Sequence, residues 1–554
     1  ATFNESSADV DFRVESNGNA NMLFVDGGND RVGIGAVPTA AKLEVHGGVW
    51  NTSLLIKSSG TNGGIKFVDS DGNPDGYVYA VDGDVGFLDD DNDWAVKVDT
   101  DTSTSLLVAN STKLLVDANS RISLSNNDSG SQNTIFGHSA GASLDAGSNY
   151  NTFFGYQVSD GSMADAGYNT GVGHNALGGL TSGEYNTAVG QLAGSAISSG
   201  GGNVCIGRVA GNTMDTSGSN TLVGYSTGSS IATGQTTTDG TTAVGYSALN
   251  ALTTGGQNTA VGHNAGIKNV TGSQNTYLGY NAGWGVSGQS AANNIGIGAY
   301  ALNLIRTGAD NVVIGLNAMS DLNSGNNAGA SSQNVVIGNQ AGAGAWANTQ
   351  TDGIVAIGYQ AMDGALDNVD GTVAIGSGAL GALTSGARNL AVGYKAADSL
   401  TTSSDNIAIG FQAFETATTN ASGNIVIGNY ALDSLTAGET VTNNVAIGNN
   451  ALGSCTTADG NIAIGNVAGA SVTTGSNGVM VGNGAGTAIT TALGTIAIGH
   501  GSMDAHQEGD YNMAIGYDAM GDLNHASATR NIAIGAYAGD GMSTLANLDN
   551  VFMG

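Results

Sequence analysis

The sequence contains little proline, little cysteine, few charged residues and no long apolar run. Only two of its 554 residues are proline, two are cysteine and 11% are charged. No apolar segment approaches the roughly 20 residues of a membrane-spanning helix, and no heptad pattern for a coiled coil is present. Cys205 and Cys455 lie 250 positions apart, so we expect two buried thiols rather than a disulfide.

Glycine is abundant, with 90 residues, but it does not recur at every third position as a collagen helix requires. The formal net charge is −31 at pH 7, which argues against nucleic acid as a partner. Residues 1–132 hold 20 of the 45 acidic and 8 of the 14 basic residues. The remainder of the chain is therefore sparsely charged.

One five-residue phrase, Asn-(Thr/Ile/Val)-x-(Val/Ile/Leu/Phe)-Gly, recurs from Asn133–Gly137 to Asn550–Gly554. Counted by its closing glycine it occurs 24 times, and the 23 intervals are never shorter than 17 residues, with 12 of them equal to 17. A fixed lower limit with occasional longer intervals is typical of a coil of constant circumference with looped insertions. We predict an all-β protein in which residues 129–554 form a long parallel β-solenoid of about 24 coils.

The strand phrase is apolar on both of its faces. The residue just before the glycine is apolar in all 24 copies, and the residue two before it is Ala in 12 and otherwise glycine, apolar or aromatic. Side chains alternate along a strand, so these positions lie on opposite faces, of which only one can line the coil. The other would form an apolar stripe on the order of 110 Å long, which soluble monomers rarely expose. We therefore expect a homotrimer, with the alanine column close to the axis between chains.

Two further columns predict how the coils are held together. Ala stands three residues after the closing glycine in 20 of 23 copies, which suits a turn inside a narrow coil. Asn stands four before it in 19 of 24 copies, and we expect its amide to stack from coil to coil as a ladder. Thr-(Thr/Ser)-Gly, as at Thr253–Gly255, predicts the turn before the next strand.

The N-terminal part lacks the repeat and predicts short β-strands joined by tight turns. We divide it into a β region at 1–48, expected to serve attachment, and a β-meander domain at 49–128. The expected strands are at 10–14, 22–25, 31–35, 42–45, 54–57, 64–68, 77–81, 85–88 and 94–98, with three more around Leu106, Leu114 and Ile122.

Two acidic turns in this part could suggest a metal. Asp69–Asp75 places oxygen ligands at alternate positions, but Pro74 stands where an EF-hand needs glycine and no Glu closes the loop. We expect an Asx-rich turn there and a solvated turn at Asp89–Asp93. The sequence thus predicts no metal, no cofactor and no catalytic residue, and it does not identify receptor-binding residues.

One residue after the glycine, aromatic and histidine side chains recur in many copies. They could form an outward ladder that binds sugars, but we expect instead that each ring packs on its neighbours. Three before the glycine, eight of the first nine copies have Thr, and from Ile295 onward the residue is aliphatic or Met. We expect this threonine column to face the coil interior, which disfavours ice binding.

The repeat resembles those of two families of fibrous proteins. Asn406–Gly410 and Asn531–Gly535 are similar to the repeat of trimeric autotransporter adhesin heads, which form trimers of left-handed parallel β-rolls. The longer form Asn258–Gly266, together with N-terminal phrases such as Asp11–Val14 and Asn92–Val96, is still more similar to bacteriophage tail fibres. The coil is longer than the usual autotransporter repeat, and no membrane-anchoring segment resembling that family's is present.

This resemblance implies a structural fibre of a virus, a phage tail-fibre shaft in the extracellular virion that supports host attachment. Its expected partners are two further copies, virion baseplate or tail proteins at one end, and a host-surface receptor, for example a glycan, reached by a tip. The alternative is a bacterial surface adhesin or extracellular filament. A polysaccharide-cleaving enzyme is disfavoured, because no single repeat position holds the acidic residues Asp145, Glu184, Asp310, Glu415 and Asp504 together. From the open strand edge at Gly554 and the absence of an initiating Met, we also expect that the natural polypeptide extends beyond this sequence.

Overall fold

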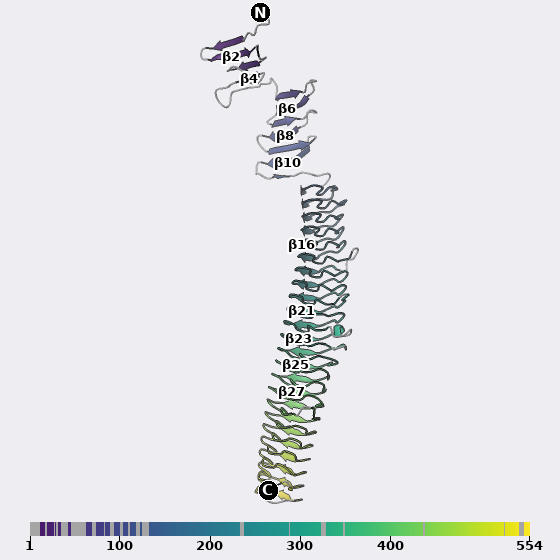
Figure 1. The fold of residues 1–554 in the computed structure, drawn as a ribbon, viewed down its shortest axis with the longest axis vertical. Coiled ribbons are helices and arrows are strands. Elements are labelled where there is room, and N and C mark those ends of the chain that lie inside the picture. Colours follow the sequence, from purple (N-terminus) through teal and green to yellow (C-terminus); the bar gives the residue numbers. More distant parts are fainter. Residues whose placement is uncertain are drawn as a thin grey trace. The chain divides into compact units, whose positions relative to one another are not determined.

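The computed structural model divides the chain into two compact units, Ala1–Asn126 and Asn127–Gly554 (Figure 1). In the first unit the structure describes the strands given below and Gly28. In the second it describes residues 132–554 except 233–237, 287, 323–327, 347–348, 436–437, 524, 526 and 542–547.

The described strands of the first unit form two sheets. The four-stranded sheet has the order β1 (Phe12–Ser16), β2 (Asn19–Asp26), β3 (Arg31–Ile34) and β4 (Leu43–Val45). The seven-stranded sheet consists of β5 (Asn62–Val68), β6 (Pro74–Val81), β7 (Asp84–Leu88), β8 (Trp94–Asp99), β9 (Ser103–Val108), β10 (Ser111–Asp117) and β11 (Ile122–Ser123). Its strands pair consecutively and antiparallel, whereas β3 and β4 pair in parallel. The expected strand at 54–57 and the acidic turns at 69–73 and 89–93 lie outside the described residues.

The second unit is a parallel β-solenoid with 24 strands in a single sheet, paired in chain order, and hence 23 turns. Each strand has three residues and coincides with the interior of one copy of the phrase. The strands are β12 (Thr134–Phe136), β13 (Thr152–Phe154), β14 (Thr170–Val172), β15 (Thr187–Val189), β16 (Val204–Ile206), β17 (Thr221–Val223), β18 (Thr242–Val244), β19 (Thr259–Val261), β20 (Thr276–Leu278), β21 (Ile295–Ile297), β22 (Val312–Ile314), β23 (Val335–Ile337), β24 (Val355–Ile357), β25 (Val373–Ile375), β26 (Leu390–Val392), β27 (Ile407–Ile409), β28 (Ile425–Ile427), β29 (Val445–Ile447), β30 (Ile462–Ile464), β31 (Val479–Val481), β32 (Ile496–Ile498), β33 (Met513–Ile515), β34 (Ile532–Ile534) and β35 (Val551–Met553). A short 3-10 helix, η1 (Ala328–Ala330), lies in the insertion between β22 and β23.

Every strand pairs with the next without a register shift, so equivalent residues of successive coils lie side by side. Thr242 faces Thr259, Ala243 faces Ala260 and Val244 faces Val261, and the same correspondence holds along the sheet. Residues at one position of the repeat therefore form a column that runs along the solenoid. The predicted all-β parallel solenoid is confirmed.

The orientation that we expected for the strand faces is wrong. The middle residue of each strand, including the alanine column, is buried inside the coil in all strands except β35, and the two flanking residues are half-buried or exposed. The interior of a coil this narrow accommodates small residues, which explains the alanine, whereas β-branched residues suit the outer face of a sheet. The threonine column likewise faces outward, so an inward orientation is no argument against ice binding. Ice binding is still disfavoured by the mixed chemistry of the outer face, because the outward column beside the threonine column is apolar.

Inside the coils, bulky residues in the middle of a strand are matched by glycines around them. Tyr277 is fully buried, and a methyl group added to Gly283 would lie 2.3 Å from its ring. Gly266, in the preceding coil, would place such a methyl 2.8 Å from the same ring. A buried alanine three residues after the closing glycine, as at Ala248, and a buried aliphatic residue four positions later, as at Leu252, complete the core.

The predicted asparagine ladder is confirmed. The amide Nδ2 of one Asn donates to Oδ1 of the Asn in the preceding coil at 2.9–3.2 Å, as in Asn169–Asn186 and Asn294–Asn311. The same Oδ1 accepts the backbone N–H of the next Asn, as for Asn169 and Asn186 at 2.9 Å. The ladder satisfies buried polar groups that would otherwise be costly in the coil interior.

The closing glycine of the phrase is required by close approach of the backbones. At Gly262 the φ angle is 140°, and an added Cβ would lie 2.3 Å from the carbonyl oxygen of Gly279 in the next coil. Only glycine allows both the left-handed backbone and the contact. The residue that follows this glycine is thereby turned outward at a fixed place in every coil.

Candidate binding surfaces

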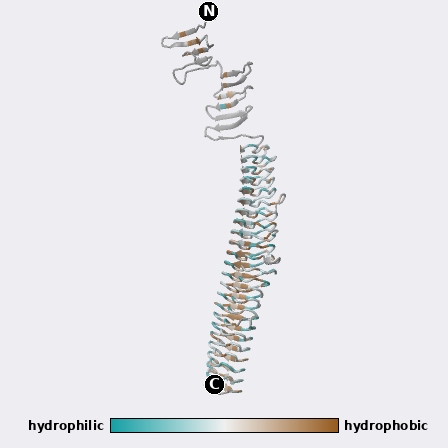
Figure 2. Cartoon of the chain, viewed as in Figure 1, coloured by the Kyte–Doolittle hydropathy of each residue, from teal (hydrophilic) through white to brown (hydrophobic). Residues whose placement is uncertain are grey.

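The outer face of the solenoid sheet carries two columns, one on each side of the buried middle residue. In β12–β20 the first column is threonine, apart from Val204, and in β21–β35 it is Ile, Val, Leu or Met. The second column is apolar throughout, with Ile464 and Ile534 exposed to 38% and 42%. Figure 2 shows the apolar colour gathered on the strands of the C-terminal part of the solenoid. This continuous apolar face is the larger of the two candidate surfaces.

The second candidate is the column of residues that directly follows the closing glycine. Its aromatic and histidine side chains stack on one another from coil to coil, with ring centroids 4.9–5.5 Å apart. The expected neighbour packing is confirmed. A ring that stacks on both neighbours, as Tyr156, Tyr246 and His263 do, offers only its edge to solvent. The members of the column are His138, Tyr156, His174, Tyr225, Tyr246, His263, Tyr280, Tyr359, Tyr394, Phe411, His500 and Tyr517.

Where the aromatic column is interrupted by Gln191 and Arg208, the chain's own groups occupy the interval. Arg208 Nε donates to Gln191 Oε1 at 3.0 Å, and Arg208 Nη1 donates to the Tyr225 hydroxyl at 3.1 Å. The Arg208 guanidinium carbon also lies 5.5 Å from the centroid of the Tyr225 ring. A flat guanidinium thus replaces a ring at this point.

A shorter aromatic column, five residues before the glycine, was not predicted from the sequence. Tyr150, Tyr168 and Tyr185 stack with centroid distances of 4.8 and 5.0 Å. All three have positive φ angles and exposed rings. Alignment of the repeats by their glycines would have shown this column, because the three tyrosines occupy one position in consecutive coils.

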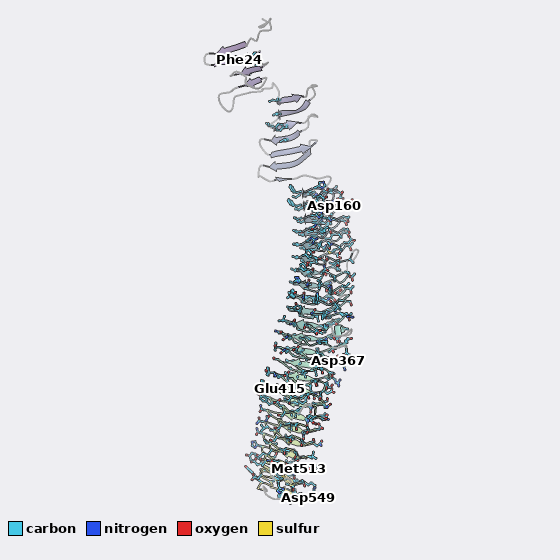
Figure 3. The ribbon with its side chains drawn as sticks, in the orientation of Figure 1. Phe24, Asp160, Asp367, Glu415, Met513 and Asp549 are labelled. Atoms are coloured by element: carbon cyan, nitrogen blue, oxygen red, sulfur yellow. The ribbon has the colours of Figure 1, made fainter. Side chains whose placement is uncertain are left out.

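The acidic residues of the solenoid are distributed along its length. Figure 3 shows Asp160, Asp367, Glu415 and Asp549 at separate heights. Exposed ion pairs join Arg388 to Asp405 and Arg530 to Asp549, and the neighbouring guanidinium lowers the pKa of each of these carboxyls. Burial raises the pKa of Asp433 to about 6, with a further contribution from the charge of Glu415.

Within the described ranges, no group of three or more His, Cys, Asp or Glu side chains could hold a metal ion. Cys205 and Cys455 are both buried and free, as predicted. Burial raises the pKa of the Cys205 thiol to about 12 and that of Cys455 to about 11, so neither thiol is activated as a nucleophile. Among the described residues, no helix is long and apolar enough to cross a membrane.

These features define the class of the protein as a parallel β-solenoid repeat protein with an apolar outer sheet face. No protein-family model and no curated protein matches the chain.

Proposed function

We propose that the chain forms the shaft of a homotrimeric viral fibre that supports attachment of an extracellular virion to its host. The observation that carries the proposal is the apolar outer face of the sheet, where the fifteen strands β21–β35 present aliphatic or Met side chains in both outward columns. With about 4.8 Å between strands, the solenoid sheet is on the order of 110 Å long. A face of this length is stabilised by burial against other chains.

In the proposed trimer the three sheets face the common axis. The contacts between chains are made by the β-branched residues that flank the buried alanine. This arrangement replaces the expected one, in which the alanine column itself lay near the axis. The aromatic column then lies beyond the closing glycine, outside the sheet face. The role is structural rather than catalytic, and the proposed partners are virion tail proteins at one end and a host receptor at a tip.

The solution mass and shape of the purified chain test the assembly. Light scattering should give three chain masses, and negative-stain images should show a rod with a shaft on the order of 110 Å. The double variant Ile462→Asp/Ile464→Asp places charges in both outward columns of β30, so we expect its trimers to dissociate. The matched variant Asn466→Asp changes an exposed turn residue of the same coil and should leave the mass unchanged. A monomeric wild-type chain would overturn the proposal.

The genes beside that of this chain test the assignment to a virus. Neighbouring genes for phage structural proteins support a tail fibre. A signal peptide upstream and an anchoring barrel downstream would instead support the bacterial surface adhesin, whose repeat is also similar.

A further inference from the structure

One coil interrupts the aromatic column with a small residue between two tyrosines. Tyr359 and Tyr394 follow the closing glycines of β24 and β26, and Ser377 follows that of β25. Equivalent rings in adjacent coils stack about 5 Å apart, so these two tyrosines, which are two coils apart, are separated by about 10 Å. Of the 23 residues that follow a closing glycine, Ser377 is the only small residue flanked on both sides by tyrosine.

The same coil is small at two further outward positions. Gly378 and Gly381 stand where the preceding coil has Gln360 and Asp363 and the following coil has Lys395 and Asp398. The result is a cavity of about 440 Å³ that opens to solvent and is lined by these residues together with Tyr359, Ser377 and Tyr394. In the Gln191–Arg208 interval the guanidinium of Arg208 fills the place of a ring. In the coil of Ser377 the side chains are too short to fill that place.

The two tyrosines supply apolar walls to this cavity, which we call the slot. Tyr394 stacks on Phe411 at 5.2 Å on the side away from Ser377, so one of its faces is covered and the other lies toward the slot. Tyr359 and Tyr394 are 50% and 47% exposed as whole residues. A ring-shaped ligand inserted at the level of Ser377 would therefore contact aromatic faces on both sides, with the spacing that the column already uses.

The remaining lining of the slot is polar and carries an excess of negative charge. Gln360 Nε2 donates to Asp363 Oδ2 at 3.2 Å, and Lys395 Nζ lies 3.3 Å from Asp398 Oδ2. Lys395 is shared with Glu415, at 3.4 Å. No cation among the lining residues forms an ion pair with Asp363, and burial raises the pKa of its carboxyl. Carboxylates accept hydrogen bonds from hydroxyl groups, whereas an anionic ligand would be repelled.

We propose that the slot binds one neutral hexopyranose unit of a glycan, inserted between Tyr359 and Tyr394 in place of the missing ring. The C–H faces of the sugar pack on the two aromatic rings, and its hydroxyl groups, at the ring edge, donate to Asp363 and Asp398. A planar aromatic compound would match the walls but would supply fewer hydroxyl donors to the two carboxylates than a sugar does. The shaft itself then contacts glycan, at a place separate from any receptor-binding tip.

Saturation-transfer NMR on the purified full chain tests this, with the methyl glycosides of glucose, galactose, mannose and N-acetylglucosamine as probes. Methyl glucuronide and p-cresol serve as the anionic and the aromatic probe. We expect transfer to at least one neutral glycoside and none to the glucuronide. The absence of transfer to every neutral glycoside, or stronger binding of the glucuronide or p-cresol, would overturn the proposal.

Three variants locate the binding. Ser377→Tyr completes the aromatic column and should abolish transfer without lowering the thermal stability. Tyr359→Ala removes one wall and should weaken binding about tenfold. Tyr246→Ala is the matched control, since that ring is covered on its two sides by Tyr225 and His263 at 5.1 and 4.9 Å, and it should bind as the wild type does. Binding that survives Ser377→Tyr would show that the sugar lies elsewhere.

The outcome is independent of the proposed fibre. The slot lies within three coils of one chain, so sugar binding by a monomer would retain the slot and reject the fibre. A trimeric rod without sugar binding would do the reverse.

Discussion

Asn275 Nδ2 donates to Asn258 Oδ1 of the preceding coil at 3.1 Å, while its backbone N–H donates to the same oxygen at 3.0 Å. Each Oδ1 thus serves two donors of the next coil, and each amide depends on its predecessor. An interruption therefore deprives the next coil of an acceptor. Thr241 is such an interruption, and among the described residues its buried hydroxyl has no hydrogen-bond partner.

Replacing Thr241 with Asn should stabilise the coils around it. The new amide would donate to Asn220 Oδ1, and its own Oδ1 would face Asn258. These three added hydrogen bonds, one to Asn220 and two from Asn258, less the entropy cost of ordering the new side chain, contribute about 1–2 kcal/mol. Hydrogen exchange of the peptide covering 238–262 measures the effect, and we expect the exchange to slow by about tenfold.

The control for the ladder is Thr241→Val, which removes the unpaired hydroxyl without supplying an amide. It should stabilise less than Asn does. Equal protection in the two variants would mean that relief of the buried hydroxyl, rather than the ladder, is responsible.

The closing glycines should tolerate no side chain, whereas a glycine with positive φ and open space around it should tolerate one. Gly262→Ala places a Cβ against the carbonyl of Gly279 and should cost about 3 kcal/mol or more, because two backbones must separate. Gly353 also has a positive φ, 68°, but an added Cβ there meets nothing within 4 Å. Gly353→Ala should therefore cost only about 1 kcal/mol of backbone strain.

Local hydrogen exchange distinguishes the two effects at these glycines. In Gly262→Ala we expect loss of protection in β18–β20, with distant coils unchanged, since each coil of a solenoid contacts only its neighbours. Similar losses in both variants would attribute the requirement for glycine to φ alone.

The buried thiols should be inert in the native protein. Because burial raises the pKa of Cys205 to about 12 and that of Cys455 to about 11, neither is ionised near neutral pH and neither is accessible. Iodoacetamide at pH 8 should leave both unmodified in the folded chain and alkylate both in denaturant. Cys205→Ala, which installs the commonest residue of its column, serves as the control for Cys455. Rapid native labelling would show that the coil opens at these positions.

The strands of the solenoid could be located from the sequence because the phrase itself is the strand with its two ends. The sequence could not show which strand face lines the coil, because the phrase is apolar on both faces and the alternation of side chains does not distinguish one face from the other. The decisive quantity is interior space, and alanine dominates where space is smallest. A large residue such as Tyr277 fits only because the neighbouring positions Gly266 and Gly283 have no side chain.

The slot is a relation among three coils, so no single repeat reveals it. Tyr359, Ser377 and Tyr394 acquire meaning once their columns are aligned and the strand spacing is known. The aromatic residues at this position are evident in the sequence, but the sequence does not distinguish a ring that is stacked on both sides from one with a free face. The structure separates them through the ring distances and the cavity.

His506 should make the stability of the solenoid sensitive to acid. It is fully buried, and its Nε2 donates to the carbonyl of Gly509 at 3.0 Å. Burial lowers its pKa, so the native state binds fewer protons than the unfolded state, whose His titrates near 6.5. The contribution of the neutral His506 to the free energy of unfolding is complete above about pH 6.5. It declines as the pH falls toward the native pKa, with a slope of up to about 1.4 kcal/mol per pH unit.

The matched variant for this histidine is His506→Leu, because equivalent positions hold aliphatic residues such as Ile489 and Leu523. Thermal unfolding followed by circular dichroism between pH 7 and pH 4.5 should show a smaller decrease for this variant than for the wild type. His500→Asn replaces an exposed histidine that stacks on Tyr517 and should keep the wild-type profile. Parallel profiles for His506→Leu and the wild type would contradict the assignment, because the acid sensitivity would then arise from other groups.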